Sequence, residues 1–151
     1  MEDWKKLMRK MKLDNINQKA PGFFKLSGGY EMKTKPYRDN TANSLTNAII
    51  DFIIFNGGDA NRINTQGQQR RINGRTCWTY GSTRKGTADI HAIFQGRAIS
   101  IEIKIGNDRQ SEAQMKEAER ITKAGGLYLV AKDMPSFLEW WYKRFKAELI
   151  K

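Results

Sequence analysis

The fold is decided by residues 88–105, which read ADIHAIFQGRAISIEIKI. Residues 88–94 are strand-like, Gln95-Gly96 has the composition of a tight turn, and residues 98–105 form a second strand. In that second strand isoleucines alternate strictly with a second set, which is Ala98, Ser100, Glu102 and Lys104. Because neighbouring residues of a strand face opposite sides, this hairpin is predicted to have one apolar and one polar face.

The segments around this hairpin predict alternating helices and strands. An apolar stripe at helical spacing runs from Leu45 to Ile53, and Ser111 to Gln114 has the form of a capping box that opens a helix. One extra strand, Thr76–Tyr80, is expected within a basic segment. From residue 41 the expected order is a helix over 45–53, strands over 60–66, 88–94 and 98–105, a helix over 111–124, a strand over 127–131 and a helix over 137–149. This order predicts an α/β fold whose mixed sheet has helices on both faces.

Residues 1–40 differ from the rest, and we expect a basic helical arm and loop ahead of a main domain over residues 41–151. The apolar residues Trp4, Leu7, Met8 and Met11 repeat at the spacing of one helix face, and basic residues fill the other. Two interpretations follow: the arm packs on the domain, or it lies on a partner or on DNA. We favour the first.

Composition restricts the classes of function. The 151 residues carry a net charge of +11 and a pI near 9.9, which favours a polyanionic partner, nucleic acid above membrane surfaces. With Cys77 and His91 as single representatives, neither an intramolecular disulfide nor a usual structural zinc site can form. No apolar run predicts a membrane span or secretory signal, and no Gly-Lys-Ser/Thr ending predicts a nucleotide-binding loop. A cytoplasmic protein without a nucleotide cofactor is expected.

Two acids and a lysine form a candidate site. Glu102 and Lys104 share one side of their strand, and Asp89 opens the preceding strand, so the hairpin brings the two carboxylates together. With the backbone carbonyl of Ile103 they make an oxygen site suited to Mg²⁺ or Mn²⁺, which would polarise a phosphoryl oxygen and acidify a bound water. Lys104 would orient or deprotonate that water, and its pKa can fall when metal and burial crowd it. Taken alone, Glu-x-Lys is more typical of a solvated strand face.

The motif Gly86-Thr87-Ala88-Asp89, the hairpin, Glu102-Ile103-Lys104 and then Ser111 to Gln114 together resemble the PD-(D/E)XK nuclease superfamily. Within it, the chain is most similar to the small stand-alone VRR-NUC domains of phages and bacteria, over about residues 41–146. The resemblance implies a restriction-endonuclease-like αβββαβ core, here with an N-terminal helical arm and a C-terminal helix, and metal-dependent hydrolysis of DNA. Because stand-alone members resemble Holliday junction resolvases, it also implies a homodimer. If encoded by a phage, it would act in the bacterial host cytoplasm.

The resemblance also implies roles for individual residues. Asp89 and Glu102 would be metal ligands, Lys104 the catalytic lysine and Gln114 a supporting active-site residue. Gln114 has an alternative interpretation, because a capping-box glutamine can simply tie down the start of its helix. The sequence departs from the family pattern at residues 43–47, where many relatives carry a glutamate and this chain has no acid. Weaker metal binding is therefore expected, and a second metal ion is doubtful.

The predicted function is that of a DNA endonuclease that uses Mg²⁺ or Mn²⁺ on double-stranded or branched DNA. His91 lies on the same strand face as Asp89, where it either contacts the site or packs beside it. Alternatives are a non-catalytic nucleic-acid-binding module that kept the fold, and a nicking or restriction-like endonuclease. Backbone contacts to DNA are expected from residues that precede the Asp89 strand, although a solvated loop has the same composition: Arg70, Arg71, Arg75, Tyr80, Ser82, Arg84 and Lys85.

Overall fold

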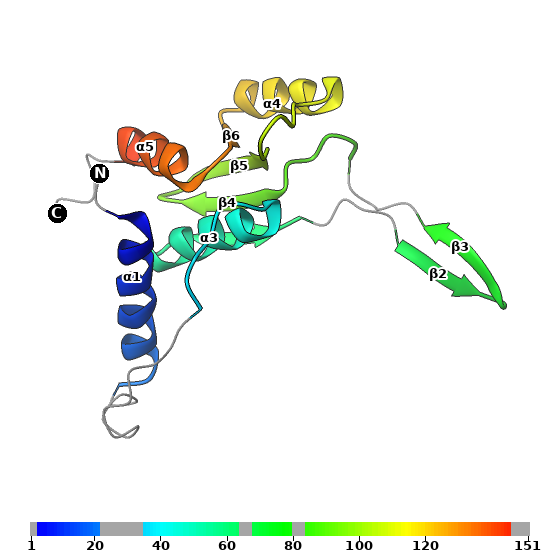
Figure 1. The fold of residues 1–151 in the computed structure, drawn as a ribbon. Helices are drawn as coiled ribbons and strands as arrows, with labels where there is room; N and C mark the ends of the chain where they lie inside the picture. Colours follow the sequence, from blue (N-terminus) through cyan, green and yellow to red (C-terminus); the bar gives the residue numbers. More distant parts are fainter. Residues whose placement is uncertain (1–2, 22–34, 64–67, 80–83, 146–151) are drawn as a thin grey trace.

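A four-stranded mixed sheet organises this computed structural model, which describes residues 3–21, 35–63, 68–79 and 84–145 (Figure 1). Its strands, in spatial order, are β1 (Asp59–Arg62), β4 (Ile90–Phe94), β5 (Arg97–Ile103) and β6 (Leu127–Ala131). The β1–β4 and β4–β5 pairs are antiparallel, and the β5–β6 pair is parallel. The parallel step requires a crossover, which helix α4 (Glu112–Lys123) provides.

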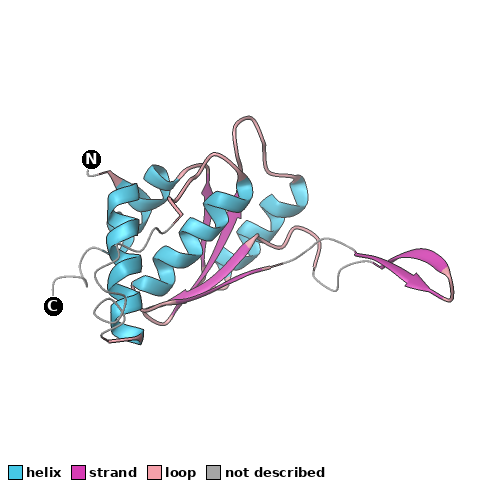
Figure 2. Cartoon of the chain, turned by 60° about the horizontal axis from the view of Figure 1, so that its bottom comes forward, coloured by secondary structure: helices cyan, strands magenta, loops and turns pink. Residues whose placement is uncertain are grey.

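Helices cover both faces of this sheet (Figures 1 and 2). On one face α3 (Ala42–Phe55) packs against α5 (Met134–Phe145), and the rings of Phe52 and Trp141 meet edge to face with centroids 5.5 Å apart. Helix α4 lies over the other face. The prediction of a mixed α/β fold with helices on both sides of the sheet is confirmed.

The hydrophobic core lies between the sheet and helices α3 and α5. The isoleucines of β5 at positions 99, 101 and 103 belong to this core and are at most 5% exposed, as their alternation predicts. The ring of Phe94 lies 4.6 Å from that of Trp141, and such aromatic pairs add about 0.5–1.5 kcal/mol beyond the area they bury. A strand anchored from this side presents its other side chains in a fixed position.

The N-terminal helix α1 (Trp4–Lys19) packs against α3 and contributes to the same core. Met8 is fully buried, and the rest of the apolar stripe packs against the core as partly buried side chains. The chain that follows α1 also returns to the domain, because the Asp39 carboxylate accepts the backbone N–H of Met134 at 3.1 Å. None of the helices in the described ranges has both the length and the apolar character needed to cross a membrane.

A second sheet of two strands is inserted between β1 and β4. It consists of β2 (Gln68–Ile72) and β3 (Arg75–Thr79), which Asn73-Gly74 joins. Both turn residues have positive φ, 50° and 77°, as a type I′ turn requires, and Asn-Gly is the preferred sequence for that turn. The sequence predicts only one strand in this segment, so the expectation is wrong for β2 although it is met by β3.

Several predicted boundaries differ from the observed ones. Strand β4 begins at Ile90, so Asp89 lies just before the strand and not in it. Strand β5 ends at Ile103, two residues earlier than predicted, and α5 begins at Met134, three residues earlier. The end of the predicted 60–66 strand lies outside the described residues, as does the end of the last helix. The two acids of the candidate site thus lie on different local structures, one in a bend and one in a strand.

Candidate active site

The Glu102 end of the polar side of β5 lies beneath the start of α4 and not in solvent. Glu102 of β5 is 2% exposed, and Lys104, directly after the strand, is 8% exposed. Carboxylate and ammonium groups are almost never buried to this extent unless they are paired. Their burial excludes the alternative that Glu-x-Lys forms a solvated strand face.

Asp89 lies opposite Glu102 in the antiparallel register that pairs Ile90 with Ile101. Its carboxylate Oδ2 accepts the backbone N–H of Ile103 at 2.8 Å, and its backbone carbonyl accepts the N–H of Ile63 at 2.8 Å. These two bonds hold Asp89 between the ends of β1 and β5. The bond from Ile103 uses one carboxylate oxygen and leaves Oδ1 for another ligand.

The two carboxylate oxygens of Glu102 have different environments. Oε1 accepts hydrogen bonds from Gln114 Nε2 and lies 3.2 Å from Lys104 Nζ. Oε2 is buried and has no hydrogen-bond partner among the residues that the structure describes. Burial, followed by the negative charge of Asp89, raises the pKa of Glu102 to about 7, although Lys104 acts in the opposite direction. The ammonium of Lys104 therefore does not fully compensate the negative charge of the Glu102 and Asp89 carboxylates.

Lys104 bridges two carboxylates. Its Nζ lies 3.2 Å from Glu102 Oε1 and donates to Asp108 Oδ2 at 3.2 Å. Burial alone would lower the pKa of Lys104, but the hydrogen bonds and charges of Glu102 and Asp108 outweigh it and raise the pKa. Asp108 adds a second acceptor to the Lys104 ammonium in the metal-free protein. The expectation that a bound metal and burial together lower this pKa stays a prediction. Lys104 is held here as a cation.

Gln114 makes both of the contacts that the two interpretations of the sequence require. In the capping box of α4, Gln114 N donates to Ser111 Oγ at 3.3 Å and Gln114 Oε1 accepts Ser111 N–H at 2.8 Å. The prediction of this capping box is confirmed. The other end of the same amide, Nε2, donates to Glu102 Oε1. One side chain thus links the start of α4 to the carboxylate beneath it.

Three polar residues at the site were not predicted: Asp108, Gln110 and Tyr128. The hydroxyl of Tyr128 and the side-chain nitrogen of Gln110 are buried and, like Glu102 Oε2, have no partner with hydrogen-bond geometry in the described part of the chain. Burial and then the charge of Glu102 raise the pKa of Tyr128 to about 12, and the nearby Gln110 partly offsets this. The alternation of β6, with Tyr128 between leucines, is the one signal for Tyr128. For Asp108 and Gln110, in the loop before α4, the sequence contains none.

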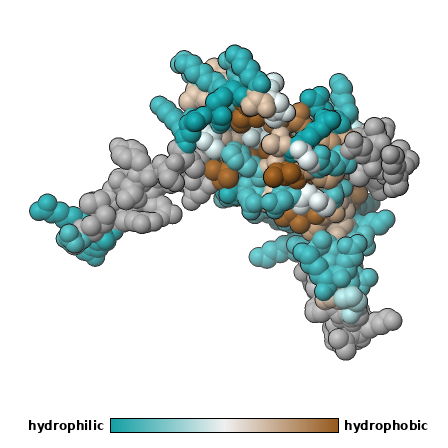
Figure 3. All heavy atoms as spheres, turned by 180° about the vertical axis from the view of Figure 1, so that it is seen from behind, coloured by the Kyte–Doolittle hydropathy of each residue, from teal (hydrophilic) through white to brown (hydrophobic). Residues whose placement is uncertain are grey.

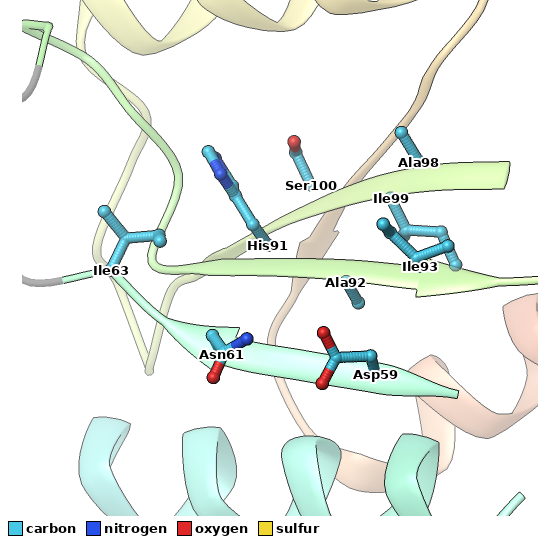
Figure 4. Close-up of a pocket in the computed structure, with 9 residues that line it drawn as sticks. All are labelled: Asp59, Asn61, Ile63, His91, Ala92, Ile93, Ala98, Ile99 and Ser100. Carbon is cyan, nitrogen blue, oxygen red and sulfur yellow. The ribbon is translucent and has the colours of Figure 1, made fainter. Parts of the chain in front are cut away.

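A shallow hollow lies on the same face of the sheet as Glu102 (Figure 4). It has a volume of about 350 Å³, and its lining includes Asp59, Asn61, His91 and Ser100. His91 and Ser100 lie opposite each other on β4 and β5 and project to the same side. Ser100 precedes Glu102 by two residues on β5, so the lining of the hollow and the candidate site share one side of that strand. His91 is exposed in this hollow and does not pack in the core.

The residues predicted to contact DNA fall into two groups. Arg84 and Lys85 are exposed immediately before Gly86, close to the site. The pKa of Glu117 on α4 is lowered by Arg120 first and by Arg84 in addition, so Arg84 lies near α4. The second group is remote from the site along the inserted hairpin, with Arg70 and Arg71 in β2 and Arg75 in β3. Tyr80 and Ser82 lie outside the described residues.

The donors at this site suit a divalent cation with a preference for oxygen. In the described part of the chain no group of three or more His, Cys, Asp or Glu side chains converges, so a site here would use Asp89 and Glu102 with the predicted Ile103 carbonyl. The buried, unpartnered Oε2 of Glu102 is an acceptor that such an ion would satisfy. A cation there would also favour the ionised carboxylate, whose pKa burial has raised. Mg²⁺ and Mn²⁺ fit this donor set.

No protein-family model matches the sequence, and no curated protein is significantly similar to it. Fold and site together define a mixed α/β protein with two carboxylates, a lysine and an amide in one buried polar notch.

Proposed function

We propose that this protein is a divalent-metal-dependent DNA endonuclease of the PD-(D/E)XK superfamily, with a VRR-NUC-like domain. The order α3-β1-β4-β5-α4-β6 supports this proposal, because it is the order that a restriction-endonuclease-like core requires once the β2–β3 hairpin is treated as an insertion. The motif residues from Gly86 to Gln114 fall at the matching places in that order. The reaction is hydrolysis of a phosphodiester bond in DNA.

The observation that carries the proposal is the meeting of Asp89, Glu102 and Lys104 at one place. Asp89 binds the backbone N–H next to Glu102, its charge raises the pKa of Glu102, and Lys104 Nζ lies 3.2 Å from Glu102 Oε1. Burying two acids and a cation in one notch costs desolvation free energy in the protein without a bound ligand. Such a cost is typical of a catalytic site.

Each residue has a role that follows from its contacts. Asp89, Glu102 and the Ile103 carbonyl would hold Mg²⁺ or Mn²⁺, which when bound supplies charge that polarises a phosphoryl oxygen and acidifies water. Lys104 would offset the charge of the phosphate and orient or deprotonate the attacking water. Gln114 fixes the orientation of the Glu102 carboxylate.

We propose branched or otherwise structured DNA as the substrate, cut by a homodimer in the manner of a Holliday junction resolvase. The net charge of +11 and the exposed Arg84 and Lys85 support a polyanionic ligand near the site. Four-way junctions have two-fold symmetry, which suits a symmetric dimer. A panel of labelled linear duplex, flap and four-way junction with Mg²⁺, Mn²⁺ or EDTA measures this preference and separates it from a nicking or restriction-like enzyme.

Substitution of the core residues tests the catalytic assignment. We expect Asp89→Asn and Lys104→Ala each to lower the rate of Mn²⁺-dependent cleavage by at least about 100-fold, because one removes a ligand and the other a charge beside the phosphate. DNA affinity, measured by fluorescence anisotropy in EDTA, should stay within about threefold, since charge elsewhere on the chain dominates it.

A matched control is Lys116→Ala, which removes an exposed lysine of α4 whose partner is Glu112. Its cleavage rate should equal that of the unmodified protein. Cleavage at the full rate by Asp89→Asn or Lys104→Ala would contradict the assignment of that residue to the catalytic site.

A second candidate function is a non-catalytic nucleic-acid-binding module. One observation favours it: the first turn of α3 has no acidic residue, and the hydroxyl of Ser44 in that turn is engaged with Thr41 in a capping box. The site then has fewer ligands than in many relatives in the resembled family. Calorimetry with Mn²⁺ separates the two, because absent binding at millimolar metal, together with no cleavage in the substrate panel, favours the module.

A further inference from the structure

The hairpin β2–β3 has no counterpart in the core of the fold and does not pack on it. Within the described ranges its strands pair only with each other, in a separate two-stranded sheet that stands away from the body of the molecule (Figure 1). Arg71, Asn73, Arg75 and Thr76, its described side chains, are all exposed, and the described tip is hydrophilic (Figure 3). An isolated two-stranded ribbon is at best marginally stable in water, so a partner that contacts it would stabilise it.

The charge of the hairpin indicates the chemistry of that partner. Residues 68–79 contain three arginines and no acidic residue. Strand alternation places Arg71, opposite Thr76, on one face of the ribbon and Arg75, opposite Ile72, on the other. Positive charge is thus available on both faces, which suits a ligand with phosphates on two sides.

Chain connectivity sets the position of the hairpin relative to the candidate site. Ile63, which donates to the Asp89 carbonyl, precedes Gln68 by five residues, and five residues span at most roughly 17 Å. The five-residue strands of the ribbon add about another 17 Å. The tip therefore lies within about 34 Å of Ile63, the residue hydrogen-bonded to Asp89, which is at most about one helical turn of B-form DNA.

We propose that β2–β3 is a duplex-binding arm that enters the major groove of the DNA next to the scissile phosphate. The major groove, about 12 Å wide, admits a two-stranded ribbon, and its phosphate walls would meet arginines on both faces. This proposal rests on the proposed function, in which DNA is the substrate. The proposal adds that the substrate carries a duplex of about one turn beside the cleavage point.

Binding measurements in EDTA test the arm without any contribution from cleavage. The double variant R71A/R75A should bind a 20-base-pair duplex about tenfold more weakly and reduce the slope of log Kd against log salt by about 2, one for each lost phosphate contact. Affinity for a single strand of the same length should change less. Hydroxyl-radical footprinting should lose protection within about one turn of the cut site.

The matched control is Arg97→Ala. Arg97 is also an exposed arginine next to a hairpin turn, but it lies at the opposite end of β4–β5 from Asp89. It should leave affinity, salt slope and footprint unchanged, and thermal melting should show that all variants are folded. An R71A/R75A protein with unchanged duplex affinity and salt slope would overturn the proposal, whatever its cleavage rate.

The outcomes separate this inference from the proposed function. Suppose that no substrate is cut, but that R71A/R75A weakens duplex binding and Arg97→Ala does not. This result supports the duplex-binding arm and contradicts the nuclease assignment. If cleavage depends on Asp89 and Lys104 while R71A/R75A binds duplex with normal affinity, the nuclease assignment is supported and the proposal of a duplex-binding arm is contradicted.

Discussion

The carboxylate of Glu102 accepts two donors on one oxygen and none on the other, in a buried position beside a second acid. Its pKa is raised from 4.5 to about 7. In the unfolded chain the group ionises near 4.5, so between these two pH values the folded protein binds the proton that the unfolded chain has lost. The contribution of Glu102 to the free energy of unfolding is therefore most favourable below pH 4.5. It falls as the pH rises toward 7 and stays reduced above that pH.

Glu102→Gln should stabilise the metal-free protein at alkaline pH. At pH 8 in EDTA we expect a gain on the order of 2 kcal/mol in the free energy of unfolding, because the variant has no buried charge to lose solvation. The gain should shrink toward zero at pH 4.5. Denaturant unfolding at several pH values measures this. Mn²⁺ should reverse the order, since it stabilises the protein that keeps its ligand.

The control for this prediction is Glu119→Gln, on the exposed side of α4, where Glu119 pairs with Lys123. It should change stability by less than about 0.5 kcal/mol at every pH. A Glu102→Gln protein less stable than the unmodified one at pH 8 in EDTA would contradict the sign of the argument.

At the level of elements, Gly86 couples the segment before β4 to the first turn of α4. Its φ is +87°, and a Cβ added there would lie 2.4 Å from the carbonyl oxygen of Ala113 and 2.5 Å from its carbonyl carbon. Only glycine lets the two backbones come this close. The contact holds the segment that leads to Asp89 against the first turn of α4, which contains Gln114, and this close approach accounts for the glycine that opens the motif.

Gly86→Ala should move the start of α4 away from the sheet. Gly57→Ala is its matched control, because Gly57 has a similar φ of +84° but nothing within 4 Å of an added Cβ. Both variants bear backbone strain of about 1–3 kcal/mol, and only Gly86→Ala adds a backbone clash. We expect Gly86→Ala to unfold at lower denaturant and to cleave DNA more slowly, while Gly57→Ala keeps its cleavage rate. Equal stability and activity of the two would refute the coupling.

At the level of the whole molecule, the N-terminal helix and the rest of the chain share a core. Met8 of α1 is fully buried in the same cluster as Phe52 of α3 and Trp141 of α5. The basic side of α1 faces outward, with Lys5, Lys6 and Lys10 exposed. The helix therefore stabilises the fold with one face and adds to the positive field of the molecule with the other.

Met8→Ala should destabilise the whole molecule by about 2–4 kcal/mol, because it leaves a cavity at a fully buried position. Lys10→Ala, on the exposed face of the same helix, should change stability by less than about 0.5 kcal/mol. Thermal unfolding followed by circular dichroism measures both. A single transition that shifts as a unit is expected, and separate melting of α1 would show that it does not belong to the common core.

Much of the fold was predictable from the sequence because its signals act between residues close in the chain. The period-two pattern around Glu102, the turn at Gln95-Gly96 and the capping box at Ser111 are local, and each corresponds to an observed element. Even the approach of Asp89 to Glu102 followed from local information, since one short turn joins their strands. The same reasoning applied to Asn73-Gly74 would have indicated β2.

The sequence by itself thus determined the order of the elements apart from β2, and the face on which the two acids and the lysine meet. Only the tertiary structure decided that α4 covers that face, that Asp108 shares Lys104 and raises its pKa, and that Tyr128 and Gln110 join the site. The reason is that burial, and the electrostatic energy that depends on it, is set by segments distant in the chain. A local pattern specifies which side a residue faces, but not what covers that side.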